Sequence, residues 1–341
     1  MKVLIDVGHP AHVHLFKNFI KYLGNNSHEV FVTSREKDIT TDLLNHYKIQ
    51  HTIISKARKG ILGMIWELLI RDIRTIKLHL KHKFDVSFGT SVNIAHLTAI
   101  FGVPSYVFSE DDDDIIPLFA YSTYPFATRI IIPETLKYKK WKGKRIKHNS
   151  SHKLAYLHPN NFKPNPKVLT KYNLKKDEFL IIRKSALTAH HDKNAGGINS
   201  SLLEKLLPIL NNYKIIDSKE GINNKNIDFY DMHDLLYYAK LIICDSQSMS
   251  VEAAMLGTPC MRVSTFTKRI SILEELENKY EAVYSFYPNQ KQQIIKRVNE
   301  LVSNKNLRET FQKRKEKILT EKQDFNKWMI NYFQSNLEYK K

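Results

Sequence analysis

The sequence predicts an α/β protein built from two doubly wound domains, each a parallel sheet with helices on both faces. Two observations carry this prediction. Short apolar runs alternate with helical stretches through the first half of the chain, and the same alternation starts again at residue 179. Continuous apolar strands separated by helices are typical of parallel sheets buried on both faces. The 341 residues are also sufficient for two separate cores.

In the first half, strands are expected at "KVLIDV", "HEVFVTS", "HTIIS", "DVSFG", "PSYVFS" and "TRIIIP". The expected helices are 14–24, 38–47, 61–83 and 93–102. In the second half, strands are expected at "FLIIRKS", "KIIDSK", "LIICDS" and "CMRVST", with helices at 199–210, 232–240 and 250–257. The Pro- and Asn-rich stretch 156–169 is a natural connection between domains. We therefore expect domains at 1–160 and 161–320, and a helix at 321–341 that packs back on the first domain.

Composition narrows the possible partners. The net charge of +18 reflects either lysines spread over solvated faces or an anionic partner, such as a phosphorylated ligand or an anionic membrane surface. Nucleic acid is not expected, because zinc-finger spacing, aromatic RNA-binding motifs and basic heptads are missing. Cys244 and Cys260 lie in apolar segments, as buried thiols of a reducing compartment do. Asp6 interrupts any signal peptide, so we expect a cytoplasmic protein.

The stretch "CDSQSMSVEAAMLGTP" is the most informative part of the second half. A strand leads into Ser246, Ser248 and Ser250, and a helix then runs to Gly257, which suits a left-handed position at a helix end. A helix N-terminus with serine hydroxyls can bind phosphate. Glu252, one turn later, could reach sugar hydroxyls. An ordinary serine-capped turn would have the same spacing.

This stretch resembles the donor-nucleotide motif of GT-B-fold glycosyltransferases and of non-hydrolysing UDP-N-acetylglucosamine 2-epimerases. The resemblance implies the GT-B fold, in which two Rossmann-like domains face a cleft. It also implies that Ser246, Gln247 and Ser248 bind the donor diphosphate and that Glu252 binds the ribose. Gln247 and Ser248 depart from the pattern, since those families often have glycine there.

The resemblance extends over most of the chain. "KSALTAHHDKNAGG" stands where GT-B enzymes place a loop that contacts the diphosphate, which implies donor-binding roles for Arg183, Lys184, His190 and His191. His233 begins the stretch "HDLLYYAK", where the family contacts the base. Taken whole, the chain is similar to an uncharacterised bacterial and archaeal family that is assigned to this fold.

The opening stretch "VGHPAHVHLF" places three histidines directly after the first strand. In the GT-B arrangement this loop faces the acceptor, and inverting transfer needs a base for the acceptor hydroxyl. Histidine suits that role because its ordinary pKa lies near neutrality. We expect His9 and His12 to supply the base, with Asp6 orienting a ring, and His14 to be a packing residue.

The stretch "FSEDDDDI" offers a carboxylate alternative. Glu110 ends a strand and is our second candidate for the base. Asp112, Asp113 and Asp114 are expected to form a solvated cap at a helix start. Such a run could also hold a divalent metal through oxygen ligands, but the resemblance implies metal-independent chemistry without a cofactor.

These observations favour a hexosyl- or N-acetylhexosaminyltransferase. Its expected donor is a nucleotide sugar, with UDP as the first choice of nucleotide, and its expected acceptor is a cell-surface glycan or a lipid-linked molecule. The alternative is an epimerase resembling the UDP-N-acetylglucosamine 2-epimerases, since "LTAHHDKNAG" and Glu110 have counterparts there. Against it, the first loop lacks the arginine-rich opening of those enzymes, and "SFGTS" lacks their acid. A binding or scaffold protein of the same fold is a third class.

Residues 60–83 combine an apolar face with several basic side chains. We expect the apolar face, which includes Ile61, Ile65, Leu69 and Leu80, to pack on the sheet. The solvated basic side could then dock on anionic lipid, as suits a peripheral enzyme with a lipid-linked acceptor.

Overall fold

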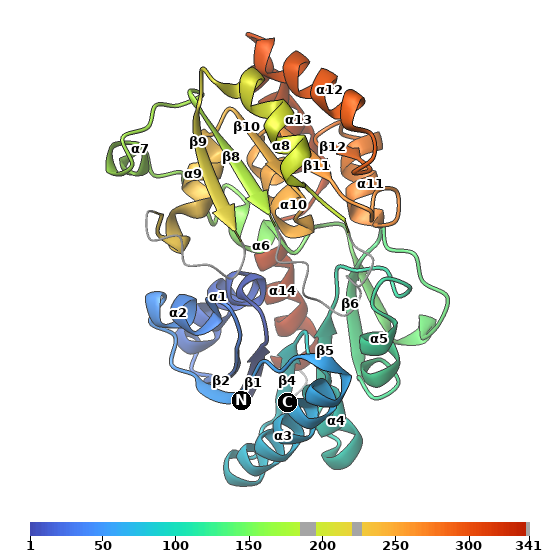
Figure 1. The fold of residues 1–341 in the computed structure, drawn as a ribbon. Coiled ribbons are helices and arrows are strands. Elements are labelled where there is room, and N and C mark those ends of the chain that lie inside the picture. The colour runs from blue at the N-terminus through green and yellow to red at the C-terminus, as the bar shows by residue number, and fades with distance from the viewer. Residues whose placement is uncertain (185–195, 220–226, 339–341) are drawn as a thin grey trace. The chain divides into compact units, whose positions relative to one another are not determined.

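The computed structural model describes residues 1–184, 196–219 and 227–338 (Figure 1). The chain forms two compact units. Unit 1 comprises residues 1–156 and 323–341, and unit 2 comprises residues 157–322. The chain therefore leaves unit 1 in the Pro- and Asn-rich connection and returns to it for the last helix.

In the described part of unit 1, seven parallel strands form one sheet in the order β3-β2-β1-β4-β5-β6-β7. The order reverses between β1 and β4, and such a switch point is where doubly wound sheets bind ligands at their carboxyl edge. The strands are β1 (Lys2–Val7), β2 (Glu29–Glu36), β3 (Thr52–Lys56), β4 (Val86–Gly89), β5 (Ser105–Phe108), β6 (Arg129–Pro133) and β7 (Arg145–His148).

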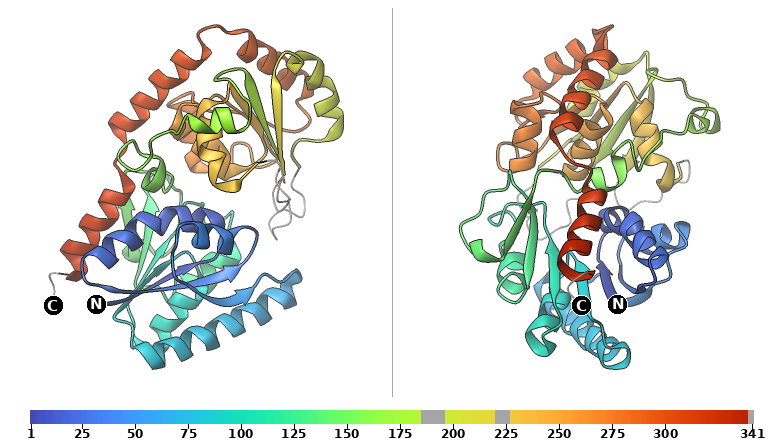
Figure 2. Two further views of the ribbon diagram at one scale, coloured as in Figure 1. Left: turned by 90° about the vertical axis from the view of Figure 1, so that its left-hand side faces the viewer. Right: turned by 180° about the vertical axis from the view of Figure 1, so that it is seen from behind.

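The helices of unit 1 pack on this sheet. Helix α14, near the end of the chain, lies beside α1, as both views of Figure 2 show. Phe333 of α14 meets Phe19 of α1 with ring centroids 5.8 Å apart, so α14 packs within unit 1 through an aromatic contact. The helices are α1 (Pro10–Asn25), α2 (Thr40–His46), α3 (Gly60–His82), α4 (Val92–Phe101), α5 (Pro117–Thr123), α6 (Leu154–Leu157), whose last residue is the first of unit 2, and α14 (Phe325–Phe333).

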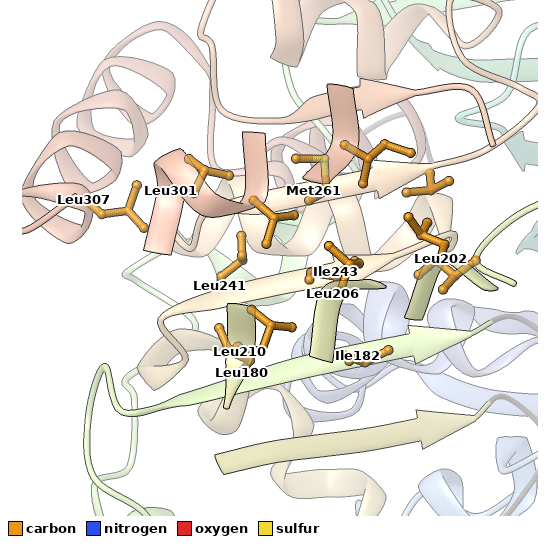
Figure 3. Close-up of a cluster of buried hydrophobic side chains, with 14 of the residues drawn as sticks. Leu180, Ile182, Leu202, Leu206, Leu210, Leu241, Ile243, Met261, Leu301 and Leu307 are labelled. Carbon is orange, nitrogen blue, oxygen red and sulfur yellow. The ribbon is translucent and has the colours of Figure 1, made fainter. Parts of the chain in front are cut away.

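In the described part of unit 2, five parallel strands have the order β12-β11-β10-β8-β9. Here the switch point lies between β8 and β10. Figure 3 shows the core on one face of the sheet, where Leu202, Leu206 and Leu210 pack against strand residues such as Ile243. The strands are β8 (Phe179–Lys184), β9 (Lys214–Lys219), β10 (Leu241–Cys244), β11 (Cys260–Val263) and β12 (Tyr284–Phe286).

The described helices of unit 2 include α10, which is buried from Met249 to Leu256. Gly257 ends it in the left-handed conformation with φ 70°, as the sequence predicts. The set is α7 (Lys167–Lys171), α8 (Ser200–Leu210), α9 (Met232–Tyr238), α10 (Gln247–Leu256), α11 (Ser271–Asn278), α12 (Lys291–Ser303) and α13 (Leu307–Glu321).

The predicted strands all form, but two sheet edges, β7 and β12, were not expected from the sequence. Helix α1 begins four residues before the predicted start, because His9 caps it and Pro10 occupies its first turn. Cys244 and Cys260 are buried thiols, as predicted.

Helix α3 corrects one prediction. Its apolar face does not pack on the sheet: Ile61, Ile65, Leu69 and Leu80 are all exposed. The buried stripe is instead polar and consists of Glu67, Arg71, Thr75 and His79. Among the residues that the structure describes, no helix is both long and apolar enough to span a membrane.

Candidate functional site

The histidine loop lies at the switch point of unit 1. His12 is half-buried in the first turn of α1, and Thr90, which follows β4, places its Oγ1 2.5 Å from Nδ1 and 3.1 Å from Nε2 of the ring. The Gly8 amide donates to Nδ1 over a longer 3.4 Å. The pKa of His12 is held well below its usual value. Burial is the largest cause, and the positive charges of the nearby His9 and Lys153 add to it. The ring is therefore neutral at neutral pH and keeps a lone pair.

The other two histidines have different surroundings. His9 is the N-cap of α1, and its Nδ1 accepts a hydrogen bond from the Ala11 amide at 3.2 Å. His14 is buried, stacks on Tyr156 with centroids 5.1 Å apart, and lies 3.3 Å from the Tyr47 hydroxyl. His14 is a packing residue, as expected.

Asp6 does not orient a histidine, which corrects that prediction. Its fully buried carboxylate accepts hydrogen bonds from Arg71 and Ser91 on one oxygen and from Thr33, at 2.6 Å, on the other. Arg71 also donates to Asn93 at 3.0 Å. A buried ion pair needs such additional hydrogen bonds, so Asp6 anchors α3 to the sheet.

Glu110 is held by the loop after β7. Its carboxylate accepts from Lys153 Nζ at 2.9 Å, the Ser151 hydroxyl at 2.6 Å and the His152 amide at 2.7 Å. Burial alone would raise the pKa of Glu110, but the charges of Lys153 and His152 and these hydrogen bonds lower it to about 2. A carboxylate with so low a pKa, already bound by three donors, is a weak base.

The acidic run after Glu110 is not a solvated cap. Asp112 is buried and accepts from the Lys137 amide at 2.8 Å, and Asp113 forms an ion pair with Arg145 at 2.5 Å. Of this run, Asp114 is exposed. Within the described residues, no group of three or more His, Cys, Asp or Glu side chains could hold a metal ion.

In unit 2, the predicted donor motif lies at the second switch point. Ser246 is the N-cap of α10, and its hydroxyl accepts from the Met249 amide at 3.4 Å. Gln247 and Ser248 form the first turn, where helix amides have no partner within the helix. The Ser250 hydroxyl donates back to the Ser246 carbonyl at 2.7 Å and is buried. Helix dipole and amides together favour an anion at this turn.

Glu252 and His233 come together one turn further along. Their side chains, from α10 and α9, approach to 3.5 Å between Oε1 and Nε2, and both are largely buried. The rings of Phe162 and His233 are nearly perpendicular, with centroids 6.4 Å apart. The sequence placed these two residues in one site, and the structure brings them into direct contact.

The end of β8 supplies positive charge beside β10. Arg183 pairs in register with Cys244 and donates to the Ser218 hydroxyl at 2.7 Å. Lys184 follows it and is half-buried. The other two predicted donor-loop residues, His190 and His191, lie outside the described residues.

Three neighbours of these sites were missed by sequence reasoning. Thr90 could have been found, since β4 follows β1 across the switch point and their carboxyl ends must meet. Lys153 lies 43 residues from Glu110 in an unremarked loop and had no such signal. Gly197 passes so close to Asp245 that an added Cβ would overlap the carboxylate, which explains a glycine just before α8.

One protein family matches nearly the whole chain. The sequence profile of the family described as "Protein of unknown function (DUF354)" matches residues 1–338. No curated protein matches the sequence.

Among solved structures, the chain is similar to MnaA from S. aureus with UDP, at TM-score 0.71 and 13% identity, over 99% of this chain and 97% of that one. It is also similar to the spinosyn forosaminyltransferase SpnP (TM-score 0.64, 11% identity, 96% of each chain). A third is the UDP-GlcNAc 2-epimerase from Neisseria meningitidis with UDP-GlcNAc (0.58, 12%, 94% of this chain and 100% of that one). The predicted GT-B fold of two Rossmann-like domains is thus confirmed.

Proposed function

The chain belongs to this DUF354 family, and we propose that it is a glycosyltransferase which moves a sugar from a UDP donor to an acceptor hydroxyl. The observation that carries the proposal is the capped turn at the N-terminus of α10, together with the buried pair of Glu252 and His233. We assign the diphosphate to the turn of Ser246, Gln247 and Ser248.

The nucleoside end of the donor is assigned to the next turn. Glu252 would accept hydrogen bonds from the two ribose hydroxyls, which are donors at a fixed spacing, while His233 holds the carboxylate in place. Hydrogen bonds to a charged group contribute about 1.5–3 kcal/mol each. Arg183 and Lys184 at the end of β8 supply positive charge for the leaving diphosphate, so the proposed reaction assigns no step to a metal or cofactor.

His12 is the proposed base. The proposed tautomer carries its proton on Nδ1 and donates it to Thr90 over the shorter 2.5 Å contact, in place of the 3.4 Å contact with the Gly8 amide. The lone pair is then on Nε2, which can take the proton of the acceptor hydroxyl. The acceptor oxygen then bonds to the anomeric carbon while the bond from that carbon to UDP breaks. His9 keeps its role as helix cap and can donate from Nε2 to the acceptor.

The proposed acceptor is a cell-surface glycan or a lipid-linked sugar, and the proposed location is the cytoplasm, where nucleotide sugars serve such polymers. The basic composition and the charges around His12 suit an acceptor that carries phosphate or carboxylate groups. No part of the assignment needs nucleic acid.

A thermal-shift screen of nucleotides tests the donor site. UDP or a UDP sugar should raise Tm, because a ligand that binds only the folded state stabilises it. If no nucleoside diphosphate shifts Tm at millimolar concentration, the donor assignment fails and a scaffold role is favoured.

NMR of a UDP-sugar mixture then separates the two enzyme classes. A transferase leaves a UDP sugar unchanged until an acceptor is added, whereas an epimerase alters the sugar without one. The fold is shared with proteins of both classes, so this measurement decides between them.

A further inference from the structure

Helix α3 of unit 1 has its polar and apolar faces exchanged relative to an ordinary surface helix. The residues at four-residue spacing that face the sheet are polar and make specific contacts: Glu67 binds Arg35 at 2.6 Å, and Arg71 binds Asp6. On the opposite face, Leu62 is 83% exposed and Trp66 is 55% exposed. A soluble surface normally presents the reverse pattern.

The exposed face continues for the length of the helix. Leu69, Ile73 and Leu80 follow at helical spacing, and each is about half exposed. We call Leu62, Trp66, Leu69, Ile73 and Leu80 the α3 ridge. In the left view of Figure 2, α3 runs along the outside of the sheet, with its first turns extending beyond it. Contiguous exposed apolar surface of this kind marks an interaction site.

The charges beside the ridge have a single sign. In the fully described stretch from 58 to 83, each exposed charged side chain is cationic: Arg58, Lys59, Arg74, Lys77, Lys81 and Lys83. The two acids of the helix each have a partner within unit 1, since Glu67 pairs with Arg35 and Asp72 Oδ2 lies 2.8 Å from His96 Nδ1. An apolar ridge flanked by cations is complementary to anionic phospholipid, whose headgroups neutralise the cations while the acyl boundary takes the apolar side chains.

We propose that the α3 ridge docks unit 1 on an anionic membrane surface, with Trp66 at the headgroup level. The alternative occupant, a second copy of this chain related by a two-fold axis, would bring two sets of cations together, which disfavours that contact. Because no described helix can span a bilayer, the proposed contact is reversible and in the plane of the interface. This proposal concerns the location of the protein and is independent of the donor assignment.

Vesicle cosedimentation of the full chain tests the proposal. The protein should bind vesicles of phosphatidylcholine mixed with phosphatidylglycerol, and bind vesicles of phosphatidylcholine alone far less. Salt should release it, because exposed charges are screened. The variant Lys77→Glu/Lys81→Glu should lose binding by well over tenfold, as each neutralised cation alone weakens partitioning by about fivefold. The control Lys176→Glu/Lys205→Glu changes exposed lysines of unit 2 and should bind like the wild type.

The apolar contribution is tested separately. Trp66→Ser/Leu69→Ser should lose vesicle binding and keep its melting curve, because both side chains are exposed in the folded chain. Leu207→Ser, which removes a 49% exposed leucine from α8, is the matched control. Equal binding by the ridge variants and the wild type would overturn the proposal. So would ultracentrifugation that shows a dimer broken by Trp66→Ser, since the ridge would then be a contact between copies.

Discussion

The two candidate sites share one backbone feature and differ in the side chains that decorate it. In unit 1, α1 follows β1 beside the switch point and is capped by His9. In unit 2, α10 follows β10 beside the switch point and is capped by Ser246. Each cap accepts a backbone amide of the first turn, with an imidazole nitrogen in one unit and a hydroxyl in the other.

The surroundings of the two caps indicate different chemical roles for the two units. Around α1, His12 and His152 have lowered pKa values and Glu110 is held as an anion, so protonation is controlled there. Around the turn of α10 the groups are backbone amides and hydroxyls, which bind anions without titrating near neutrality. We therefore connect unit 1 with proton transfer and unit 2 with donor binding, and the following experiments test that separation.

The largest effect is expected from His12→Ala. Removing a general base lowers the rate by about 10²–10⁴, whereas UDP affinity should stay within a factor of two or so of wild type, on the scale of a surface change. Turnover with acceptor and calorimetry with UDP measure the two quantities. Thr90→Val removes the hydroxyl near Nδ1 of His12 and should also lower turnover, but by less than His12→Ala does.

If His12→Ala keeps its turnover and Glu110→Gln loses it, the base is the carboxylate of Glu110, which belongs to unit 1 as well. Proton transfer would then stay in unit 1 with a different residue. If His12→Ala instead loses UDP affinity, the two sites are not separate in function.

The next effect concerns pH and should appear in unit 1. Burial lowers the pKa of His152 to about 4 in the folded protein, and burial also lowers the pKa values of His12 and His79. As pH falls through 6.5 the unfolded chain takes up protons that the folded chain does not, so stability is lost. His152 alone should account for about 2–3 kcal/mol between pH 7.5 and pH 4.5.

Urea unfolding followed by tryptophan fluorescence reports on unit 1, since Trp66, Trp141 and Trp328 all belong to it. His152→Phe should flatten the pH dependence, because the buried ring stacks on Phe325 and its Nε2 has no hydrogen-bond partner among the described residues. His46→Phe, at an exposed histidine of the same unit, should leave it unchanged. An equal slope in all three proteins would show that His152 titrates normally.

For unit 2, Glu252→Gln should weaken UDP binding by about 5- to 150-fold, or about 1–3 kcal/mol, the scale of a lost charged hydrogen bond. Calorimetry measures the affinity, and circular dichroism confirms that the variant is folded. Glu309→Gln removes an exposed carboxylate of α13 in the same unit and should bind UDP normally. An unchanged Kd for Glu252→Gln would leave its pair with His233 a packing contact of α9 and α10.

The fold was predictable because buried strands have a strong local pattern. "VLI" and "LIIC" are continuous apolar runs next to polar or turn residues, and Gly257 marks a helix end by conformation alone. The edge strands β7 ("RIKH") and β12 ("YSF") are short and partly polar, so pairing with a neighbour rather than local sequence determines them.

The sites were predictable only as far as one segment supplies them. The contact of His12 with Thr90 depends on β1 pairing with β4, and that of Glu110 with Lys153 on a loop 43 residues away. Helix α3 shows the other limit: periodicity identifies an apolar face but does not say whether it is buried. In α3, Glu67 pairs with Arg35 and Arg71 pairs with Asp6. Because of these contacts the polar face of the helix is buried and the apolar face is exposed.

The smallest expected effect comes from the two caps themselves. Ser246→Ala removes the side chain that accepts from the Met249 amide and should lower the unfolding free energy of unit 2 by about 0.5–2 kcal/mol. Ser246→Asp keeps an acceptor and should stay near wild type in stability, yet its negative charge at the proposed diphosphate turn should repel UDP. His9→Ala should lower the stability of unit 1 by a similar amount and leave UDP affinity unchanged.

The informative result is that of Ser246→Asp, because a stable protein with weakened UDP binding would place the diphosphate at this cap. If Ser246→Asp binds UDP as tightly as wild type does, the α10 turn is only a helix cap, and the two units are alike in structure without the difference in chemical roles.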